Sequence, residues 1–309
     1  MGPVAASCLV ARLPERLGNE QVRSVGLEDS LHAAAMSTTI VAGCFRLALA
    51  IPITCAVFAS PAFGQSSAEE LAKKLANPVA ALISVPFQLN YDRDIGSGRE
   101  GTRWLLNIQP VVPIELNADW NIISRTILPL VSQDDIYPGA GRQNGIGDVV
   151  QSVFFSPKKP TEGGWIWGAG PVFLLPTGSD DLLSAKKWGA GPTGVALKQD
   201  GPWTYGALAN HIWSFAGNDS RSDISATFVQ PFLTYTTPTA WSFALNTEST
   251  YDWKARQWLV PINAIVTKVT KVGDQLVSLG GGVHYWADSP DTGPHGWGFR
   301  LVFTLLYPK

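Results

Sequence analysis

The chain has 309 residues, of which 45% are hydrophobic and 16% are charged, and its formal net charge at pH 7 is -2. Without a basic excess, nothing in the charge balance indicates a nucleic-acid partner. After residue 64 no apolar run approaches the roughly 18 residues that a spanning helix needs. A membrane location would therefore require a closed β-barrel, in which every backbone polar group is paired without a helix.

The first 64 residues have the features of an export signal. Met36 opens a segment that contains Arg46 and an apolar run at 47–60, and small residues at 62–64 form a cleavage site for a signal peptidase. We expect translation to start at Met36 and cleavage before Gln65, so that 1–64 is an N-terminal extension plus a secretory signal peptide. A mitochondrial-type presequence or a genuine N-terminal domain is the alternative.

All three cysteines of the chain lie in this leader. The expected mature chain therefore has no disulfide, no thiolate metal site and no cysteine nucleophile. The leader also holds four basic and four acidic residues, which leaves 19 basic and 21 acidic residues in the mature part. A cysteine-free exported chain fits a periplasmic or outer-membrane protein of a Gram-negative bacterium.

Residues 65–79 are predicted to form a short periplasmic helix. Ser66 is followed three residues later by Glu69, and Ser67 by Glu70. Either pair has the pattern of a capping box. Asn77-Pro78 ends the helix, because the residue before a proline disfavours helical backbone.

Residues 102–131 show the pattern that the remaining chain repeats. From Trp104 to Leu116 the apolar side chains fall largely on every second position, with polar residues between them, as in a strand with one apolar face. Asn117–Asp119 then turns the chain, and a second alternating segment follows. Strands of roughly ten or more residues exceed the length of about five or six that is usual in soluble sheets and match a tilted bilayer crossing. We interpret this unit as a transmembrane β-hairpin.

The part at 80–309 contains an even number of such segments, as bacterial single-chain barrels require. The twelve segments are 80–91, 103–116, 120–131, 147–156, 165–176, 188–198, 203–215, 225–236, 241–250, 258–268, 275–286 and 297–307. Connections after odd-numbered segments are mostly longer and polar, and those after even-numbered segments are mostly shorter. Longer outer loops and short periplasmic turns are typical of outer-membrane barrels. The sequence thus predicts an all-β fold, a transmembrane antiparallel barrel of about 12 strands, with both termini in the periplasm.

The tryptophans give an independent indication, since each lies at or near the end of a predicted strand. Trp104, Trp188, Trp213, Trp253, Trp258, Trp286 and Trp297 are placed toward the outer rim, and Trp120, Trp165, Trp167, Trp203 and Trp241 toward the periplasmic rim. Two aromatic belts are what the two membrane interfaces favour. A soluble β protein should also carry tryptophan in mid-strand.

Prolines inside the predicted strands argue against a regular barrel, because each removes a ladder hydrogen bond and a barrel has no edge strand. They are Pro86, Pro110, Pro113, Pro129, Pro171, Pro192, Pro231 and Pro261. Bulges can absorb some of them.

The last predicted strand alternates apolar and small or polar residues from Trp297 to Tyr307. Its glycine followed by alternating apolar residues resembles the strand that the outer-membrane assembly machinery recognises, although it ends Tyr307-Pro308-Lys309 without a terminal aromatic residue. The expected partners are this machinery, outer-membrane lipid and lipopolysaccharide, and a small-molecule solute.

Several strand and turn motifs together resemble one bacterial family. They are Asn77-Pro78, Asn90-Tyr91-Asp92, Asn107-Ile108-Gln109-Pro110, Asp119-Trp120-Asn121, Arg125-Thr126, Gly147-Asp148, Gly191-Pro192, Trp213-Ser214-Phe215-Ala216-Gly217, Gln230-Pro231-Phe232 and Asn246-Thr247-Glu248-Ser249. The family is named for the meta-pathway of phenol degradation and is often labelled "transporter" or neuromedin U. The similarity covers roughly 77–309. It implies an outer-membrane β-barrel that passes small compounds, aromatic or apolar ones among them, and it carries over no functional residues.

Polar residues on the face opposite the apolar one are the candidate site. The inward set is Asn107, Gln109, Glu115, Asn121, Arg125, Gln230, Asn246, Glu248, Asn263 and Arg300. Amides and charges lining a lumen can form a selective constriction. The functional interpretation is that Arg125 and Arg300 face Glu115 and Glu248 across a narrow passage. The alternative is a structural network that fills a small barrel.

The sequence offers weak signals for other chemistry. An outer-membrane lipase would need a serine, a histidine and an orienting group, and the candidates are Asn210-His211, His284 with Ser278, and His295, so we do not expect an enzyme. Asp134-Asp135 and Asp288–Asp291 could bind Ca²⁺ but are interpreted as solvated loop residues. The Gly280–Gly282 run is interpreted as a strand kink, and no cofactor is implied.

The predicted function is a passive pore or transporter for small solutes in the bacterial outer membrane. Three alternatives stay open: a closed structural barrel, an outer-membrane lipid-modifying enzyme, and a secreted soluble β protein that binds carbohydrate through its tryptophans.

Overall fold

The computed structural model describes residues 68–308, so the predicted start at Met36, the signal peptide and its cleavage site lie outside the described residues. The described part begins with one short helix, α2 (Ala68–Leu75). Fifteen strands follow: β1 (Ile83–Ile95), β2 (Gly101–Ile108), β3 (Val111–Glu115), β4 (Trp120–Asp134), β5 (Arg142–Ile146), β6 (Val149–Pro157), β7 (Trp165–Leu175), β8 (Lys187–Asp200), β9 (Trp203–Gly217), β10 (Ser225–Thr236), β11 (Trp241–Thr247), β12 (Ser249–Asp252), β13 (Gln257–Val272), β14 (Gln275–Asp288) and β15 (Gly296–Tyr307).

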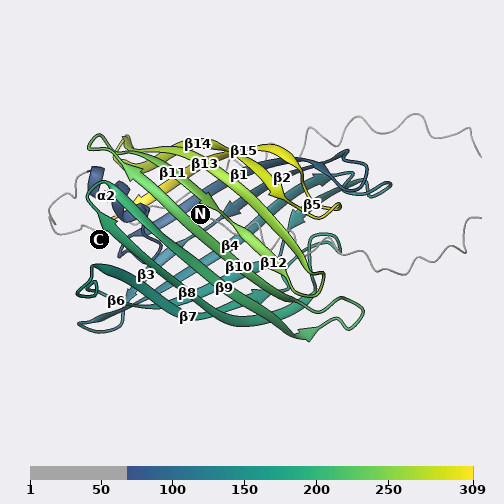
Figure 1. The fold of residues 1–309 in the computed structure, drawn as a ribbon, viewed down its shortest axis with the longest axis horizontal. Helices are drawn as coiled ribbons and strands as arrows, with labels where there is room; N and C mark the ends of the chain where they lie inside the picture. Colours follow the sequence, from purple (N-terminus) through teal and green to yellow (C-terminus); the bar gives the residue numbers. More distant parts are fainter. Residues whose placement is uncertain (1–67, 309) are drawn as a thin grey trace, which may run out of the picture. The chain divides into compact units, whose positions relative to one another are not determined.

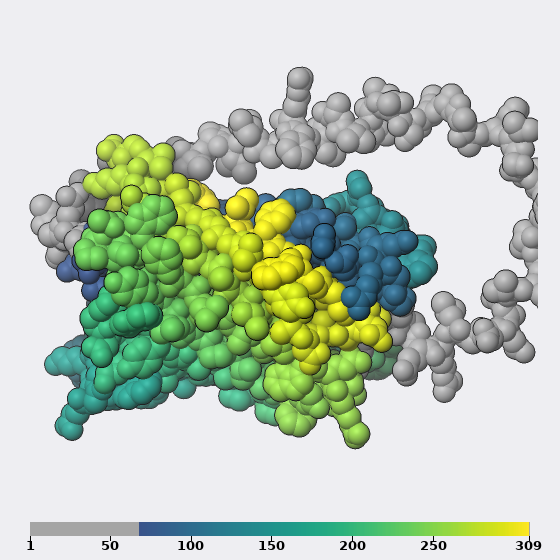
Figure 2. Space-filling model, turned by 45° about the horizontal axis from the view of Figure 1, so that its top comes forward, coloured from purple at the N-terminus to yellow at the C-terminus, as the bar shows by residue number. Residues whose placement is uncertain are grey.

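The strands form a single antiparallel sheet that closes on itself (Figure 1). β1 pairs with β15, and the pairing of β9 with β10 completes the ring. In Figure 2 the yellow C-terminal residues accordingly lie beside the blue N-terminal strands. Three pairs of strands lie end to end, because β2 and β3 share the partner β4, β5 and β6 share it on the other side, and β11 and β12 lie between β10 and β13. Counting each such pair as one stave, the barrel has twelve staves, and the predicted fold is confirmed.

Each of the three interrupted staves breaks at a buried polar residue. Gln109 lies between β2 and β3, Asp148 between β5 and β6, and Glu248 between β11 and β12, and all three are at most 1% exposed. A residue that leaves the ladder can turn its side chain away from the regular direction. The breaks thus place an amide and two carboxylates inside the barrel.

The breaks and one bulge also account for some of the prolines. Pro110 lies in the β2–β3 break, the carbonyl of Pro129 accepts a hydrogen bond from Gly147 N in the β5–β6 break, and the register shifts at Pro261. The remaining prolines lie in strands of regular register, with Pro171 directly opposite Pro192. Bulges therefore absorb only part of the predicted conflict.

The outer face of the barrel is apolar. On β15, Phe299, Leu301 and Phe303 are 36%, 53% and 38% exposed, while Arg300 and Thr304, on the opposite face, are buried. Most tryptophans are exposed or half-buried, but Trp286 is only 4% exposed. It lies near the end of β14, as predicted, but it points inward and so is not part of an aromatic belt that faces the membrane. Its indole N–H donates to Asp92 Oδ1 at 3.1 Å, which supplies a polar partner that the lipid face lacks.

This arrangement overturns the soluble alternative, which needs a second sheet to cover the apolar faces. The described residues form one sheet, and its exposed large apolar side chains cover the face that points away from the closed interior. Within 68–308 no helix is both long and apolar enough to cross a membrane.

Candidate solute site in the barrel lumen

The structure places most of the predicted lumen residues inside the barrel. The buried members are Asn107, Gln109, Arg125, Gln230, Asn246, Glu248, Asn263 and Arg300. Asn121 is half-buried near the turn that precedes β4. Glu115 is the last residue of β3, its side chain is 72% exposed, and it pairs with Lys158 of the β6–β7 turn. The expectation that Arg125 faces Glu115 is therefore wrong, because Glu115 lies at the rim.

Arg300 and Glu248 form a buried ion pair across the lumen. Nη1 and Nη2 of Arg300 each donate to one Glu248 oxygen at 2.9 Å, and Nε donates to Asn90 Oδ1 at 2.7 Å. The two-pronged geometry matches the planar guanidinium to the carboxylate. Both side chains are at most 1% exposed, so this pair is shielded from water.

Asp92 organises a second buried network. It accepts hydrogen bonds from Arg103 Nη2 at 3.0 Å and from the Trp286 indole, and its Oδ1 lies 2.8 Å from His284 Nε2. Sequence analysis missed this group because the first strand was expected to end at residue 91. The alternation of Gln88, Asn90 and Asp92 on one face was the signal that could have found it.

The loop at 176–186, between β7 and β8, folds into the barrel at the end with the longer loops. Asp148 holds it, because its carboxylate accepts hydrogen bonds from Gly178 N at 3.0 Å, Ser184 Oγ at 2.7 Å and Ala185 N at 2.6 Å. Leu183 of this loop packs against Leu105 of β2 and Val131 of β4. The loop thus fills part of the lumen at this end.

α2 fills the opposite end, where the shorter turns lie (Figure 1). Its Leu71 and Ala72 pack with Val269 of β13 and Leu306 of β15. The carbonyl of Lys73 accepts a hydrogen bond from Gln199 Nε2 of β8 at 2.9 Å, which fixes the helix on another side. The helix is therefore packed within the mouth of the barrel.

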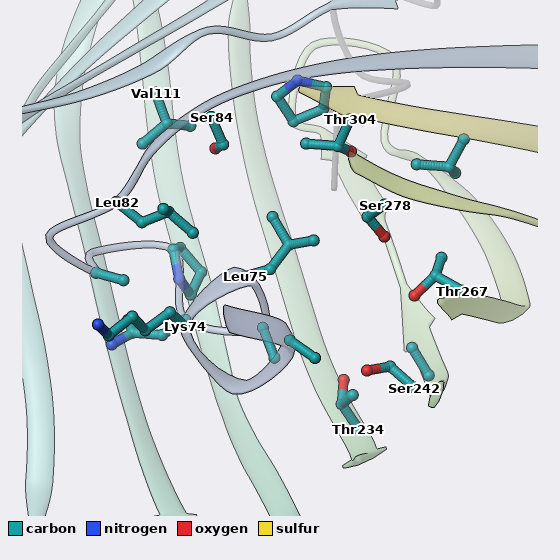
Figure 3. Close-up of a pocket in the computed structure, with 18 of the residues that line it drawn as sticks. Lys74, Leu75, Leu82, Ser84, Val111, Thr234, Ser242, Thr267, Ser278 and Thr304 are labelled. Atoms are coloured by element: carbon teal, nitrogen blue, oxygen red, sulfur yellow. The ribbon is translucent and has the colours of Figure 1, made fainter. Parts of the chain in front are cut away.

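Beside α2 lies a cavity of about 140 Å³ (Figure 3). α2 and the segment that follows it line one side, and inward side chains from β1, β3, β4, β9–β11 and β13–β15 line the other. The hydroxyl groups of Ser242, Thr267 and Ser278 and the apolar side chains of Leu75 and Leu82 share this space. The cavity is thus partly polar and partly apolar.

Buried amide groups in this cavity lack protein partners. Gln109 Nε2, Gln230 Nε2 and Asn246 Nδ2 have no hydrogen-bond acceptor within the described residues. Arg125 Nη2 donates to Gln109 Oε1 at 3.5 Å, and Arg125 forms no ion pair in the described part of the chain. Buried polar groups are normally paired, so these donors are suited to a bound molecule or to water.

The wall formed by β4 and β6–β10 is largely apolar. Two clusters cover it, one of Ile127, Val150, Val172, Leu174, Ala185, Ile212, Ile224 and Ala226, and one of Val79, Ile123, Phe154, Val195, Leu197, Leu208, Phe228 and Phe232. Both include a residue from outside the barrel strands, Ala185 from the inward loop and Val79 from the segment after α2. The interior therefore has one polar wall and one apolar wall.

The candidate catalytic groups do not assemble into a hydrolase site. No hydrogen bond joins Ser278 to His284, whose partner is Asp92. His211 contacts Thr227 Oγ1 at 2.7 Å and Ser225 Oγ at 3.3 Å, but Thr227 also accepts from the Trp253 indole, so the third group is a hydroxyl already in use. His295 contacts backbone carbonyls. Residues 68–308 contain no cluster of three or more His, Cys, Asp or Glu side chains suited to a metal ion.

The closed antiparallel barrel with an apolar outer face defines the chain as a transmembrane β-barrel of the bacterial outer membrane. Its fold is similar to that of an outer membrane channel from Pseudomonas putida F1, with a TM-score of 0.58 and 16% identity over 74% of this chain and 96% of that one. Outer membrane phospholipase A from Escherichia coli gives a TM-score of 0.45 and 10% identity, over 79% and 99% of the two chains. The β domain of the Bordetella autotransporter BrkA gives 0.43 and 13%, over 74% and 100%. No protein-family model and no curated protein matches the sequence.

Proposed function

We propose that the protein is a passive pore or transporter for small solutes in the outer membrane. The observation that carries the proposal is a closed barrel whose lumen holds a cavity with unpartnered buried amide donors. Buried polar groups without partners are costly when a site is purely structural. Their presence along a lumen favours a site that solutes occupy.

Two further points support this function. The barrel similar in fold from Pseudomonas putida F1 is described as an outer membrane channel. The apolar wall adds a surface on which aromatic or apolar compounds can lie, in agreement with the resemblance to the phenol meta-pathway family. Membership of that family and a preference for such compounds are part of the proposal.

The same proposal names the partners. The apolar outer face implies contact with outer-membrane lipid and lipopolysaccharide, and the alternating aromatic residues of β15 fit recognition by the assembly machinery. Ten residues are proposed to set the selectivity of the lumen. Glu115 and Asn121 would act at the periplasmic rim and the others within.

Solute uptake into liposomes tests the proposal. The purified full-length protein is reconstituted, and swelling or uptake is measured for sugars, amino acids and aromatic acids, with conductance in planar bilayers as a second measurement. We expect protein-dependent passage of the smallest solutes and little passage of larger ones, because α2 and the loop at 176–186 narrow the lumen. Arg125→Ala should alter the selectivity or the rate, since it removes a charge from the cavity wall.

Arg142→Ala is the matched control for that change. Arg142 is also an arginine, but its side chain is 68% exposed and pairs with Asp134 at the outer rim. No conductance and no uptake by the wild-type protein would contradict a pore and favour a closed structural barrel. Hydrolysis of phospholipid that is lost in His211→Ala would favour an enzyme instead.

A further inference from the structure

We propose that the cavity beside α2 binds a small monocarboxylate with an apolar body, whose carboxylate lies against Arg125. The inference deepens the proposed function by naming the substrate class, and it rests on that function only for the step from binding to transport. The juxtaposition of a buried cation without a direct ion pair, three amide donors without acceptors and an apolar lining in one cavity carries it.

The charge of Arg125 is the first step of the argument. The other buried cations of the described chain each have a carboxylate, with Arg103 next to Asp92, Lys187 next to Asp223 and Arg300 next to Glu248. Arg125 is 6% exposed and has an amide oxygen as its partner. Glu248 acts on Arg125 through its charge from beyond ion-pair distance. A buried charge is normally paired, so Arg125 calls for an anion in direct contact, which the described residues do not supply.

The donors around the cavity are the second step. Gln109 turns its oxygen to Arg125, which leaves Nε2 without a partner, and Asn246 turns its oxygen to Asn263 Nδ2 at 2.9 Å, which leaves Nδ2 without one. Gln230 adds a third unpartnered Nε2. Amide N–H groups donate and cannot accept, so the free atoms of this set complement an acceptor with several lone pairs.

The shape and lining of the cavity select the rest of the ligand. Leu75, Leu82, Leu208 and Ile265 supply an apolar lining. The volume of about 140 Å³ is close to the roughly 150 Å³ of an apolar cavity known to hold benzene. A single guanidinium and an apolar wall suit one carboxylate with a compact apolar body better than a doubly charged phosphate.

Glu248, between β11 and β12, is the buried carboxylate whose charge acts on Arg125 and could oppose an anion. Its two oxygens are both engaged by Arg300 at 2.9 Å, so the pair is neutral as a unit. Arg125, Arg300 and Glu248 together therefore carry a net positive charge, which favours an anion.

Calorimetric titration of the purified protein in detergent tests the inference, with benzoate as the probe and benzyl alcohol as its neutral counterpart of similar size. We expect benzoate to bind the wild-type protein at least about tenfold more tightly than benzyl alcohol, because hydrogen bonds to a charged group are the stronger ones. Arg125→Gln should weaken benzoate binding by about tenfold or more and leave benzyl alcohol binding unchanged. Arg125→Lys should retain part of the preference.

Two further variants keep the test decisive. Gln230→Met removes an amide donor at nearly constant size and should weaken benzoate in the same direction, and it replaces Arg125→Gln if that variant fails to fold. Arg142→Gln removes an exposed arginine and should have no effect. Folding is checked by the heat-dependent shift of the barrel on gels.

The outcomes separate this inference from the proposed function. Equal binding of benzoate and benzyl alcohol, or benzoate binding that is unchanged in both Arg125→Gln and Gln230→Met, overturns the carboxylate site. If the liposomes conduct solutes and benzoate does not bind, the pore stands and the carboxylate site fails. If benzoate binds with the expected dependence on Arg125 and no solute passes, the site stands and the transport function fails.

Discussion

The two walls of the lumen are held in different ways. On the polar wall, directional contacts such as those of Glu248 with Arg300 and of Asp92 with Arg103 fix each buried group. On the apolar wall, residues such as Phe154 and Leu197 are buried by packing alone. A polar contact fails when one partner is lost, whereas packing loses stability in proportion to the atoms removed. The polar wall is thus suited to fixing geometry and the apolar wall to adapting to a ligand body.

The largest expected effect comes from breaking the buried ion pair. Glu248→Ala should lower the free energy of unfolding by about 3–5 kcal/mol, because it leaves the guanidinium of Arg300 buried without a counter-charge. Denaturant unfolding of the reconstituted barrel measures this change. The control is the double substitution Glu248→Met with Arg300→Met, which should recover most of the loss since no charge remains buried. A single substitution that costs as little as the double one would show that the polar wall is not held by this pair.

A truncation on the apolar wall should cost less. Leu197 of β8 is fully buried in the cluster that includes Phe154 and Phe228. Leu197→Ala should lower the free energy of unfolding by about 3 kcal/mol, through lost transfer energy and a residual cavity. Leu174 lies in the other apolar cluster. The losses in unfolding free energy from Leu197→Ala and Leu174→Ala should add, unlike those from the changes at Glu248 and Arg300. Strong coupling between the two leucines would remove the distinction between the walls.

The sequence predicted the staves far better than the contacts between them. Alternation with period two reports which face a side chain occupies, so the inward positions of Asn107, Arg125 and Arg300 followed from local pattern. It does not report which staves meet across the lumen. Asp92 and His284 are 192 positions apart in sequence, and no local pattern joins them. The position of Glu115 was also beyond local pattern. The alternation of β3 predicted an inward side chain, but Glu115 is the last residue of β3 and lies at the rim.

The inward fold of the loop at 176–186 was also beyond local pattern. Gly147-Asp148 was predicted to begin a strand. In the structure Asp148 lies outside the strand ladder, and its carboxylate accepts hydrogen bonds from the loop. Such a contact depends on the break between β5 and β6, which the period of the sequence does not show. The presence of the barrel was therefore predictable, and the closure of its ends was not.

A substitution at the exposed tip of the loop at 176–186 should have the smallest effect on stability. It distinguishes the contacts at the rim of the barrel from those of the two lumen walls. The hydrogen bond from Lys186, together with its charge, lowers the pKa of Asp181 below the ordinary value of 3.8. A carboxyl whose pKa is lowered on folding contributes stability above its unfolded pKa and loses it as the pH falls through the folded value. Asp181→Asn should therefore lower the unfolding midpoint slightly at neutral pH, and the difference from wild type should shrink from about pH 3.8 and vanish as the pH falls through the lowered pKa of the folded state.

The salt dependence of that difference is the sharper measurement. The Asp181 side chain is 75% exposed, so its interaction with Lys186 should be screened as salt is added. The Glu248–Arg300 pair is shielded from water, and its contribution should change little over the same range. If the loss of stability in Glu248→Ala depends on salt, water and ions reach the polar wall freely. The lumen would then be wider than the packing of α2 and of the loop at 176–186 implies.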